Sequence, residues 1–361
     1  MVHATDLADL RARIQVHIDQ ELARQREILA ESGGEAEPLV AAIASLLRGG
    51  KRLRAAFCYW GYLAAGGGHL AGAERAAVAM EFFQAAALLH DDVMDDSAIR
   101  RGMPSAHRAL AAAHADAGWD GDADRFGTAG AILAGDLCLV WSDEVLTSCG
   151  LPPEELSRSR PIFDAMRSQL MAGQFLDVLV SVRGWRDLSL SDRLGQARRV
   201  IRYKSAKYSV EQPVLFGARA AGADPSDLTH LSRFGLDLGE AFQLRDDVLG
   251  VFGDPDATGK PAGDDLREGK RTVLLALALD GASLDEAARL EDALGRPDLT
   301  ADQVEALRDL IAATGALDRL EARIGELTCS ARHALAASER LLEPGRAMLD
   351  HLVDVATARV S

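Results

Sequence analysis

The chain has 361 residues, a length that fits two or three domains or one large domain with a single core. Its 40 basic and 55 acidic side chains give a formal net charge of −15, which excludes a protein that binds nucleic acid through a basic surface. Apolar residues make up 48% and charged residues 26%, which excludes a largely disordered chain. A small phosphorylated ligand stays possible, because a basic cluster or a bound divalent cation reverses the local charge.

Cysteine usage and the N-terminal segment indicate where the protein resides. The four cysteines form no Cys-x-x-Cys pair, so we expect reduced thiols and a cytoplasmic protein. The N-terminal segment carries acids and arginines where a signal peptide would be apolar. No uninterrupted apolar run reaches about 18 residues, so the sequence predicts no membrane span.

Helix is the only regular structure that the residue pattern supports. Alanine, leucine and arginine dominate long segments, and no alternating apolar and polar stretch indicates a strand. Breaks between the expected helices fall near residues 32–34, 49–50, 66–68, 99–104, 115–127, 150–153, 184–188, 221–224 and 253–269. Most of these breaks are short, which favours one all-α helical bundle over residues 1–361 rather than separate domains.

Prolines and long breaks give finer expectations along the chain. Asp224 followed by Pro225 is typical of a helix start, because aspartate caps free N–H groups and proline fits the first turn. Pro213 falls inside a helix expected from about residue 190 to 221, and it predicts a kink there. The stretches 115–127 and 253–269 are long enough for a functional loop or lid.

An aspartate cluster ends the helix that begins near residue 71. Asp91 and Asp95 are four residues apart and so lie on one helical face, while Asp92 is offset by one position. Their repulsion and the helix dipole both oppose this arrangement. A divalent cation would offset both effects, and carboxylate oxygens suit Mg2+. A solvated acidic helix end remains the alternative for this segment taken alone.

A second acidic face is expected in the helix that follows Asp224. Gln243, Asp246 and Asp247 stand at positions i, i+3 and i+4, so one face presents an amide and two carboxylates. Taken alone, this pattern also fits a surface acid pair.

Basic residues accompany both acidic faces. Lys51 and Arg54 follow two glycines at a helix start, where backbone N–H groups, the helix dipole and two cations favour an anion. Other basic residues follow the acidic faces or lie between them: Arg100, Arg101, Lys204, Lys207, Lys260 and Lys270. Two carboxylate clusters and several cations in one acidic protein match a pair of polyanions bridged by a metal.

The order of these motifs resembles that of the trans-isoprenyl diphosphate synthases, the polyprenyl synthetase family, over about residues 40–275. The segments 91–95 (DDVMD) and 246–250 (DDVLG) match the family's two aspartate-rich motifs. A Gly-Lys-x-x-Arg segment precedes the first motif, and Arg-Arg-Gly-x-Pro, Gly-Gln-x-x-Asp (173–177) and Lys-Ser follow it. The resemblance implies an isoprenoid-synthase bundle around a central apolar cavity. Residues 276–361 carry no motif and are expected to form packing helices.

The resemblance implies that Mg2+ is the cofactor and that three ions are bound when substrate is present. It also implies that Mn2+ can replace Mg2+. The metal ligands would be Asp91, Asp92, Asp95, Asp246 and Asp247. The allylic diphosphate would also contact Arg100, Lys204 and Lys260. The metal-free diphosphate of isopentenyl diphosphate would contact Lys51, Arg54, Gln84 and Arg101. Lys270 would close over the site, while Ser205 and Gln243 would face the developing allylic cation.

Three positions depart from the family's common pattern. Gly250 stands where many relatives have a third aspartate, so the second motif has two carboxylates. Ser205 replaces a threonine and keeps the hydroxyl, and Gln84 replaces a histidine and still donates hydrogen bonds. None of these changes removes a required chemical group.

The implied reaction is the condensation of isopentenyl diphosphate with dimethylallyl, geranyl or farnesyl diphosphate. The small residues Ala86 and Ala87 stand five and four positions before Asp91 and leave room beyond a C15 chain. One turn further from Asp91, Phe82 and Phe83 would form a floor, unless their rings point into neighbouring helices. We therefore expect the C20 product geranylgeranyl diphosphate, with C25–C40 products as the alternative.

Two other functions remain as rival hypotheses. A class I terpene cyclase shares the first motif, but the second Asp-Asp pair and the Lys51 and Arg54 anion site disfavour it. A non-catalytic subunit of a heteromeric synthase is disfavoured by the intact metal ligands. The resemblance also implies a homodimer, for which the apolar helix around residues 129–145 is a candidate interface.

Overall fold

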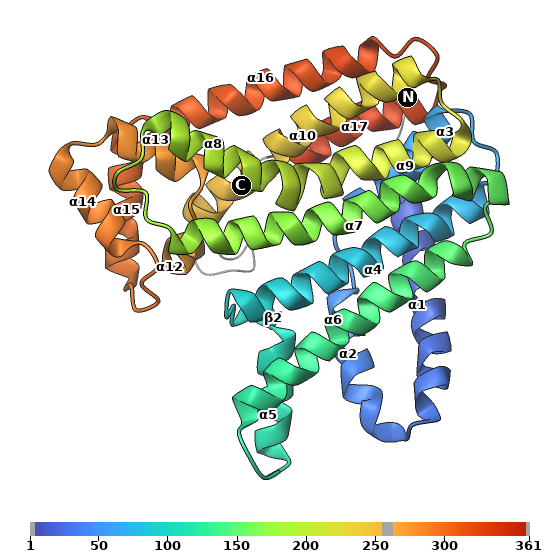
Figure 1. Cartoon of the computed structure of the whole chain (residues 1–361), viewed down its shortest axis with the longest axis horizontal. Coiled ribbons are helices and arrows are strands. Elements are labelled where there is room, and N and C mark those ends of the chain that lie inside the picture. Colours follow the sequence, from blue (N-terminus) through green and yellow to red (C-terminus); the bar gives the residue numbers. More distant parts are fainter. Residues whose placement is uncertain (1–3, 255–262, 359–361) are drawn as a thin grey trace. The chain divides into compact units, whose positions relative to one another are not determined.

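The computed structural model describes residues 4–254 and 263–358, and it is all-α, as predicted (Figure 1). The β structure within these ranges is one short antiparallel pair, β1 (Ile99–Arg100) and β2 (Met103–Pro104). No helix in the described part of the chain combines the length and apolar character of a membrane span.

The chain divides into two compact units, and neither is one continuous stretch of sequence. The first comprises Met1–Pro161, Pro213–Asp224 and Arg340–Leu349. The second comprises Ile162–Gln212, Pro225–Glu339 and Asp350–Ser361. Two helices, α7 (Pro153–Val182) and α17 (Gly345–Thr357), therefore contribute several residues to each unit, and Gln212, the first residue of α9 (Gln212–Ala221), also belongs to the second. The expectation of a single domain stays a prediction.

The first unit is organised around α4 (Leu70–Met94), which packs against α6 (Ala123–Thr147), as Figure 1 shows. The Phe82 ring of α4 meets Trp141 of α6 edge to face, with 6.1 Å between centroids. Ser142 Oγ donates to the Ala79 carbonyl at 2.8 Å between the same helices. The other helices of this unit are α1 (Ala4–Ala30), α2 (Glu37–Leu46), α3 (Leu53–Ala64), α5 (Ala106–Asp116) and α9 (Gln212–Ala221). These contacts bury one face of α4 against α6.

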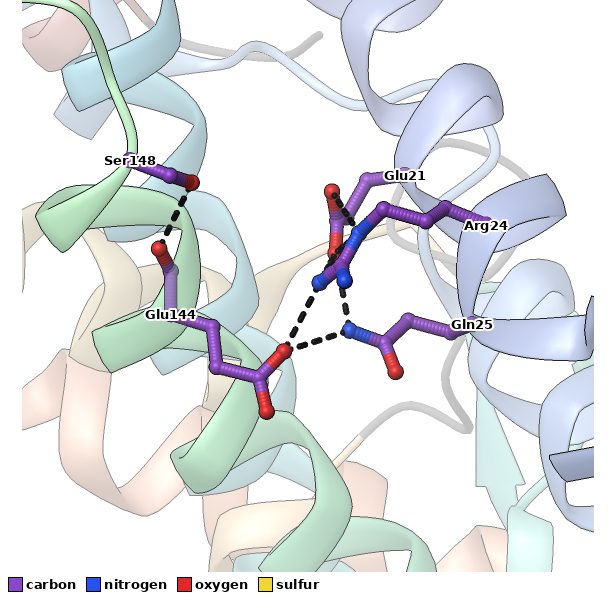
Figure 2. Close-up of polar contacts among 5 residues, drawn as sticks. All are labelled: Glu21, Arg24, Gln25, Glu144 and Ser148. Atoms are coloured by element: carbon purple, nitrogen blue, oxygen red, sulfur yellow. Dashed lines mark hydrogen bonds and ion pairs between the residues drawn. The ribbon is translucent and has the colours of Figure 1, made fainter. Parts of the chain in front are cut away.

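The C-terminal half of α1 is tied to α6 by a polar cluster, shown in Figure 2. Arg24 Nη2 donates to Glu21 Oε1 at 2.6 Å and to Glu144 Oε2 at 2.7 Å. Gln25 Nε2 donates to the same two oxygens, each at 2.8 Å. Ser148 Oγ donates to the Glu144 carbonyl within α6. These contacts hold the N-terminal helix α1 against α6 within the first unit.

The second unit is organised around α10 (Pro225–Phe252), which begins at the proline that the sequence predicts as a helix start. It packs against α16 (Ala316–Ala336) and a π-helical segment, η2 (Ile201–Glu211). The remaining helices are α8 (Leu190–Val200), α12 (Asp264–Glu268), α13 (Val273–Gly281), α14 (Leu284–Ala293) and α15 (Ala301–Ala313). Apolar side chains of this unit, including the fully buried Trp185, form one continuous core cluster.

The helix expected from about residue 190 to 221 is not one α-helix. It is α-helical in α8, π-helical through η2, and α-helical again in α9. Pro213 is the second residue of α9, directly after this change of helix type. A second proline, Pro161, lies inside α7. π-Helical segments are rare in proteins, and those that occur often lie at functional sites. The position of Lys204 and Ser205 in η2 therefore fits a functional role.

Candidate active site

The first acidic motif occupies the end of α4. Asp91 and Asp92 lie in its last turn, and Asp95 is the C-cap residue, whose N–H donates to the Asp91 carbonyl at 2.9 Å. Asp91 and Asp95 are partly exposed, whereas Asp92 is 2% exposed. The shared face of Asp91 and Asp95 is therefore as the spacing predicts.

A hairpin after α4 brings two arginines to this region. Arg101 and Gly102 form the turn between β1 and β2, and both have positive φ, 54° and 74°, as a type I′ turn requires. The Nε of Arg100 donates to Asp92 Oδ1 at 2.9 Å, and its Nη2 lies 3.6 Å from Asp91 Oδ2. Asp92 is thus paired with a protein cation, a contact that its spacing alone does not reveal.

The cations expected to bind isopentenyl diphosphate gather around the loop before α3. Lys51 is exposed in this loop, and Arg54 lies in the first turn of α3. Arg101 Nη1 donates to the Leu46 carbonyl at 2.9 Å, and a Cβ on Gly50 would lie 3.3 Å from Arg101 Nη2. Burial lowers the pKa of Arg101, and the positive charges of Arg52, Arg100 and Arg54 lower it further. Predicted binding cations from three segments therefore lie together in the first unit.

Gln84 stands on α4 seven residues before Asp91, which is two helical turns along the same face. It is partly exposed, as is Ala87 between them, whereas Ala86 is buried. Phe82 and Phe83 are both fully buried. The contact of Phe82 with Trp141 directs that ring toward α6, which leaves Phe83 as the aromatic one turn before Ala87.

The second acidic motif lies on α10 in the second unit. Gln243 Nε2 donates to Asp247 Oδ1 at 2.9 Å, while Asp246 is exposed. Burial raises the pKa of the Asp247 carboxyl well above its usual value, and the negative charges of Asp265 and Asp246 raise it further. The hydrogen bond from Gln243 and the charge of Lys270 act in the opposite direction. This carboxyl is therefore placed where a cation would stabilise its charged form.

Asp265 is a carboxylate that the sequence reasoning missed. A Cβ on Gly250 would lie 2.0 Å from Asp265 Oδ2, so the carboxylate fills the space beside the glycine that replaces the third aspartate. Lys270 Nζ lies 3.8 Å from Asp265 Oδ1 and 2.6 Å from Glu268 Oε2. The available signal is the run Gly263-Asp-Asp-Leu-Arg-Glu-Gly-Lys270, which places acidic residues close to the lysine in the sequence.

The η2 segment carries Lys204 and the buried Ser205. Lys204 Nζ donates to Asp177 Oδ2 at 2.5 Å, and Asp177 ends the Gly-Gln-x-x-Asp segment of α7. A Cβ on Gly173 would lie 2.4 Å from the carbonyl carbon of Tyr203, so α7 and η2 approach closely at that glycine. Two motifs that are about 30 residues apart therefore form one local structure.

The predicted site residues are thus divided between the two units. Lys51, Gln84 and Arg101 belong to the first unit with the aspartates of α4, and Lys270 to the second with those of α10. Lys260 lies outside the described residues. Within the described ranges, no three His, Cys, Asp or Glu side chains are grouped closely enough to hold a metal ion by themselves.

Sequence comparison identifies the family. A sequence profile described as polyprenyl synthetase matches residues 36–311, which is more than half of the chain. The chain therefore belongs to the polyprenyl synthetase family. It is a prenyltransferase of the trans-isoprenyl diphosphate synthase type, as the order of its motifs indicates.

Known proteins of this type resemble the chain over most of its length. A geranylgeranyl pyrophosphate synthase from Corynebacterium glutamicum, solved with isoprenyl diphosphate and magnesium, is 39% identical with a TM-score of 0.91, covering 98% of this chain and 99% of that one. The geranylgeranyl diphosphate synthase of Sulfolobus acidocaldarius is 32% identical over 78% of this chain and 74% of its own length. The nonaprenyl diphosphate synthase of Mycobacterium tuberculosis is 31% identical over 96% and 92%. Similar relatives thus include enzymes named for different product lengths.

Proposed function

We propose that the protein condenses isopentenyl diphosphate with allylic diphosphates and releases C20 geranylgeranyl diphosphate as its main product. The observation that carries this proposal is the grouping of Lys51, Arg54 and Arg101 in the same unit as Asp91 and Asp95. A cationic loop suits a metal-free diphosphate, and a carboxylate pair suits a diphosphate bound through a divalent cation. A terpene cyclase needs only one diphosphate site, so this arrangement disfavours that alternative.

The donor set fits Mg2+. All proposed ligands are carboxylate oxygens, and the buried Asp247 experiences the negative charges of Asp246 and Asp265. Each acidic helix end supplies few ligands, which suits an ion that completes its coordination with substrate phosphate oxygens and water. When bound, Mg2+ would neutralise charge on the leaving diphosphate. Mn2+, which prefers the same oxygen ligands, would substitute.

In this proposal the protein's own residues bind and orient two diphosphates. Lys204 and Arg100 contact the allylic diphosphate and stabilise the charge that grows on it as the carbon–oxygen bond breaks. Lys51 and Arg54 hold isopentenyl diphosphate so that its double bond forms the new carbon–carbon bond. Ser205 and Gln243 face the allylic cation through oxygen atoms. The proton that is then lost passes to the released diphosphate, so no separate protein base is required.

Product length would be set on α4. The methyl side chains of Ala86 and Ala87 leave space beside Asp91, and the buried Phe83 lies one turn beyond them. The relative from Sulfolobus acidocaldarius, named as a C20 synthase, supports this assignment. The nonaprenyl relative favours a longer product as the alternative.

The proposal includes a homodimer that forms through α6. Three apolar residues of this helix, Phe126, Leu133 and Val140, are 40%, 54% and 55% exposed and recur every seven residues. This heptad spacing puts them on one stripe that a second helix can cover. Sedimentation of the protein, with Leu133→Glu expected to yield monomers, tests this part of the proposal. A wild-type monomer would contradict it.

The activity is tested by incubating the pure protein with Mg2+, isopentenyl diphosphate and each allylic diphosphate in turn. We expect mass spectrometry to find a C20 diphosphate as the main product from all three starters. A main product of C25 or longer would overturn the length assignment alone. Cyclised hydrocarbons, or no consumption of isopentenyl diphosphate with any starter, would overturn the proposed reaction.

A further inference from the structure

The loop that precedes α3 has an unusual backbone. Gly49 and Gly50 have positive φ values of 72° and 92°, and the N-cap residue Arg52 is left-handed, with φ 52° and ψ 37°. Glycine adopts these angles without strain, but a residue with a long side chain does not. The left-handed conformation is strained for a residue that has a Cβ, so at Arg52 it persists only where surrounding contacts impose it.

The contacts that impose it begin with a buried ion pair. Arg52 is 6% exposed, and its Nη1 donates to Glu81 Oε2 of α4 at 2.8 Å. Its Nη2 donates to Gln15 Oε1 of α1 at 2.7 Å and also to the Leu47 carbonyl. The other oxygen of Glu81 accepts the Ala55 N–H of α3 at 3.3 Å. One guanidinium and one carboxylate thus join α1, α3, α4 and the end of α2.

A second contact from α1 holds the same loop. Arg11 Nε donates to the Lys51 carbonyl at 2.9 Å, and Arg11 lies four residues before Gln15, on the same helical face. Both residues line a surface pocket together with Gly49, Gly50 and Arg52. The carbonyl of Lys51 and the side chain of Arg52 are therefore both held by α1, although α1 lies outside the residues that match the family profile.

The positive charge of Arg52 is neutralised within the protein. Its guanidinium bonds to three acceptors of the protein, and the carboxylate of Glu81 balances it. Lys51 is exposed one residue before it, and Arg54 follows two residues after it. The side chain of Arg52 is thus turned into the protein, whereas Lys51 lies in the loop and Arg54 in the first turn of α3.

We propose that Arg52 is a positioning residue for the diphosphate of isopentenyl diphosphate. With Glu81 on α4 and with Arg11 and Gln15 on α1, it fixes the loop so that Lys51 and Arg54 meet one diphosphate. This inference rests on the proposed function, in which that loop binds the metal-free diphosphate. The N-terminal helix α1 thereby becomes part of the substrate site without touching the substrate.

The test measures the binding of inorganic pyrophosphate to the full chain by titration calorimetry in chelator, so that metal-bridged binding is removed. The double variant Arg52→Met/Glu81→Gln loses the anchor without leaving a buried charge unpaired. We expect it to weaken pyrophosphate binding about tenfold, as the loss of charged hydrogen bonds predicts. The KM for isopentenyl diphosphate should rise by a similar factor, while kcat and the KM for the allylic substrate should stay within about twofold. Amide hydrogen exchange over residues 49–56 should accelerate.

Gln15→Leu and Arg11→Met keep the buried ion pair, so they decide the question if the double variant does not fold. We expect each to weaken pyrophosphate binding by about threefold, since each removes one hydrogen bond to the loop. Arg24→Ala is the matched control, because it removes an arginine ion pair from the same helix at the α6 contact. It should leave pyrophosphate binding unchanged.

The outcomes separate this inference from the proposed function. If Lys51→Ala leaves pyrophosphate binding unchanged, the assignment of the loop to a diphosphate is wrong. If Lys51→Ala weakens binding but the Gln15, Arg11 and Arg52/Glu81 variants do not, the positioning role is overturned. The role is also overturned if Arg24→Ala weakens binding as much as Gln15→Leu, because loose docking of α1 would then explain the effect.

Discussion

The Nε of Arg100 donates to Asp92 Oδ1 at 2.9 Å, and this pairing divides the three aspartates of the first motif. Asp92 is buried against a protein cation, whereas Asp91 and Asp95 are partly exposed. We expect Asp91→Ala to lower kcat by about 100-fold or more, as losing one electrostatic stabiliser does, with little change in melting temperature. Asp92→Ala should lower both kcat and melting temperature, because Arg100 loses its partner. Equal melting temperatures for the two variants would contradict this division.

Activity should depend on a divalent cation. The carboxyl of Asp247 is buried beside two other aspartates, so a cation is required to hold this group of charges near a diphosphate. We expect excess chelator to abolish turnover and added Mg2+ or Mn2+ to restore it. Asp246→Ala should lower kcat by about 100-fold or more in saturating Mg2+. Full activity in excess chelator would show that the acidic motifs do not act through a metal.

The two diphosphates should separate kinetically. Lys51→Ala or Arg54→Ala should mainly raise the KM for isopentenyl diphosphate, because these groups bind it equally in ground and transition states. Lys204→Ala should act chiefly on the allylic substrate, because the proposal assigns this lysine to the allylic diphosphate. Steady-state kinetics with each substrate varied in turn measures the difference. If the Lys51 variant altered only the allylic KM, the two sites would be assigned in reverse.

Product length should respond to substitutions on α4. Ala86→Phe places a ring near Asp91 and should shorten the main product to C15. Phe83 is eight residues from Asp91, or about 12 Å along the helix axis, and Phe83→Ala should lengthen the product. Phe82→Ala is the matched control, because its ring packs on Trp141 and should affect stability more than product length. An unchanged product distribution in Phe83→Ala would remove Phe83 as the floor.

The contact between α10 and η2 depends on a glycine. A Cβ on Gly239 would lie 2.6 Å from the Cα of Ala206, one residue after Ser205. Gly239→Ala should therefore destabilise the fold by about 1–3 kcal/mol, because backbone must move. Gly325→Ala is the control, since nothing lies within 4 Å of its Cβ position on α16, and it should stabilise by up to about 1 kcal/mol. Denaturant unfolding of both variants measures the contrast; similar stability in the two would contradict it.

Features that depend on helical spacing were predictable from the sequence. The 3.6-residue period of the α-helix is enough to place Asp91 with Asp95, and Gln243 with Asp247. The start of α10 at Pro225 follows from proline chemistry in the same way. Such predictions succeed because they use only geometry within one element.

Features that depend on packing between elements were not predictable. The pairing of Asp92 with Arg100 requires the turn at Arg101 and Gly102. The sequence does not predict the positive φ values of these two residues. The π-helical segment η2 contains no residue that breaks an α-helix, and it accompanies close contacts with α7 and α10. Asp265 meets the second motif only because α12 folds back toward Gly250.

The contacts of Arg52 bear on how this protein can be shortened. The match to the family profile begins at residue 36, so a boundary chosen from that profile alone would discard α1. Removing it would leave the guanidinium of Arg52 without Gln15 and the carbonyl of Lys51 without Arg11. A trimmed enzyme would keep every recognisable motif and still bind isopentenyl diphosphate poorly. Homologues that lack a counterpart of this helix would need another source of support for the same loop.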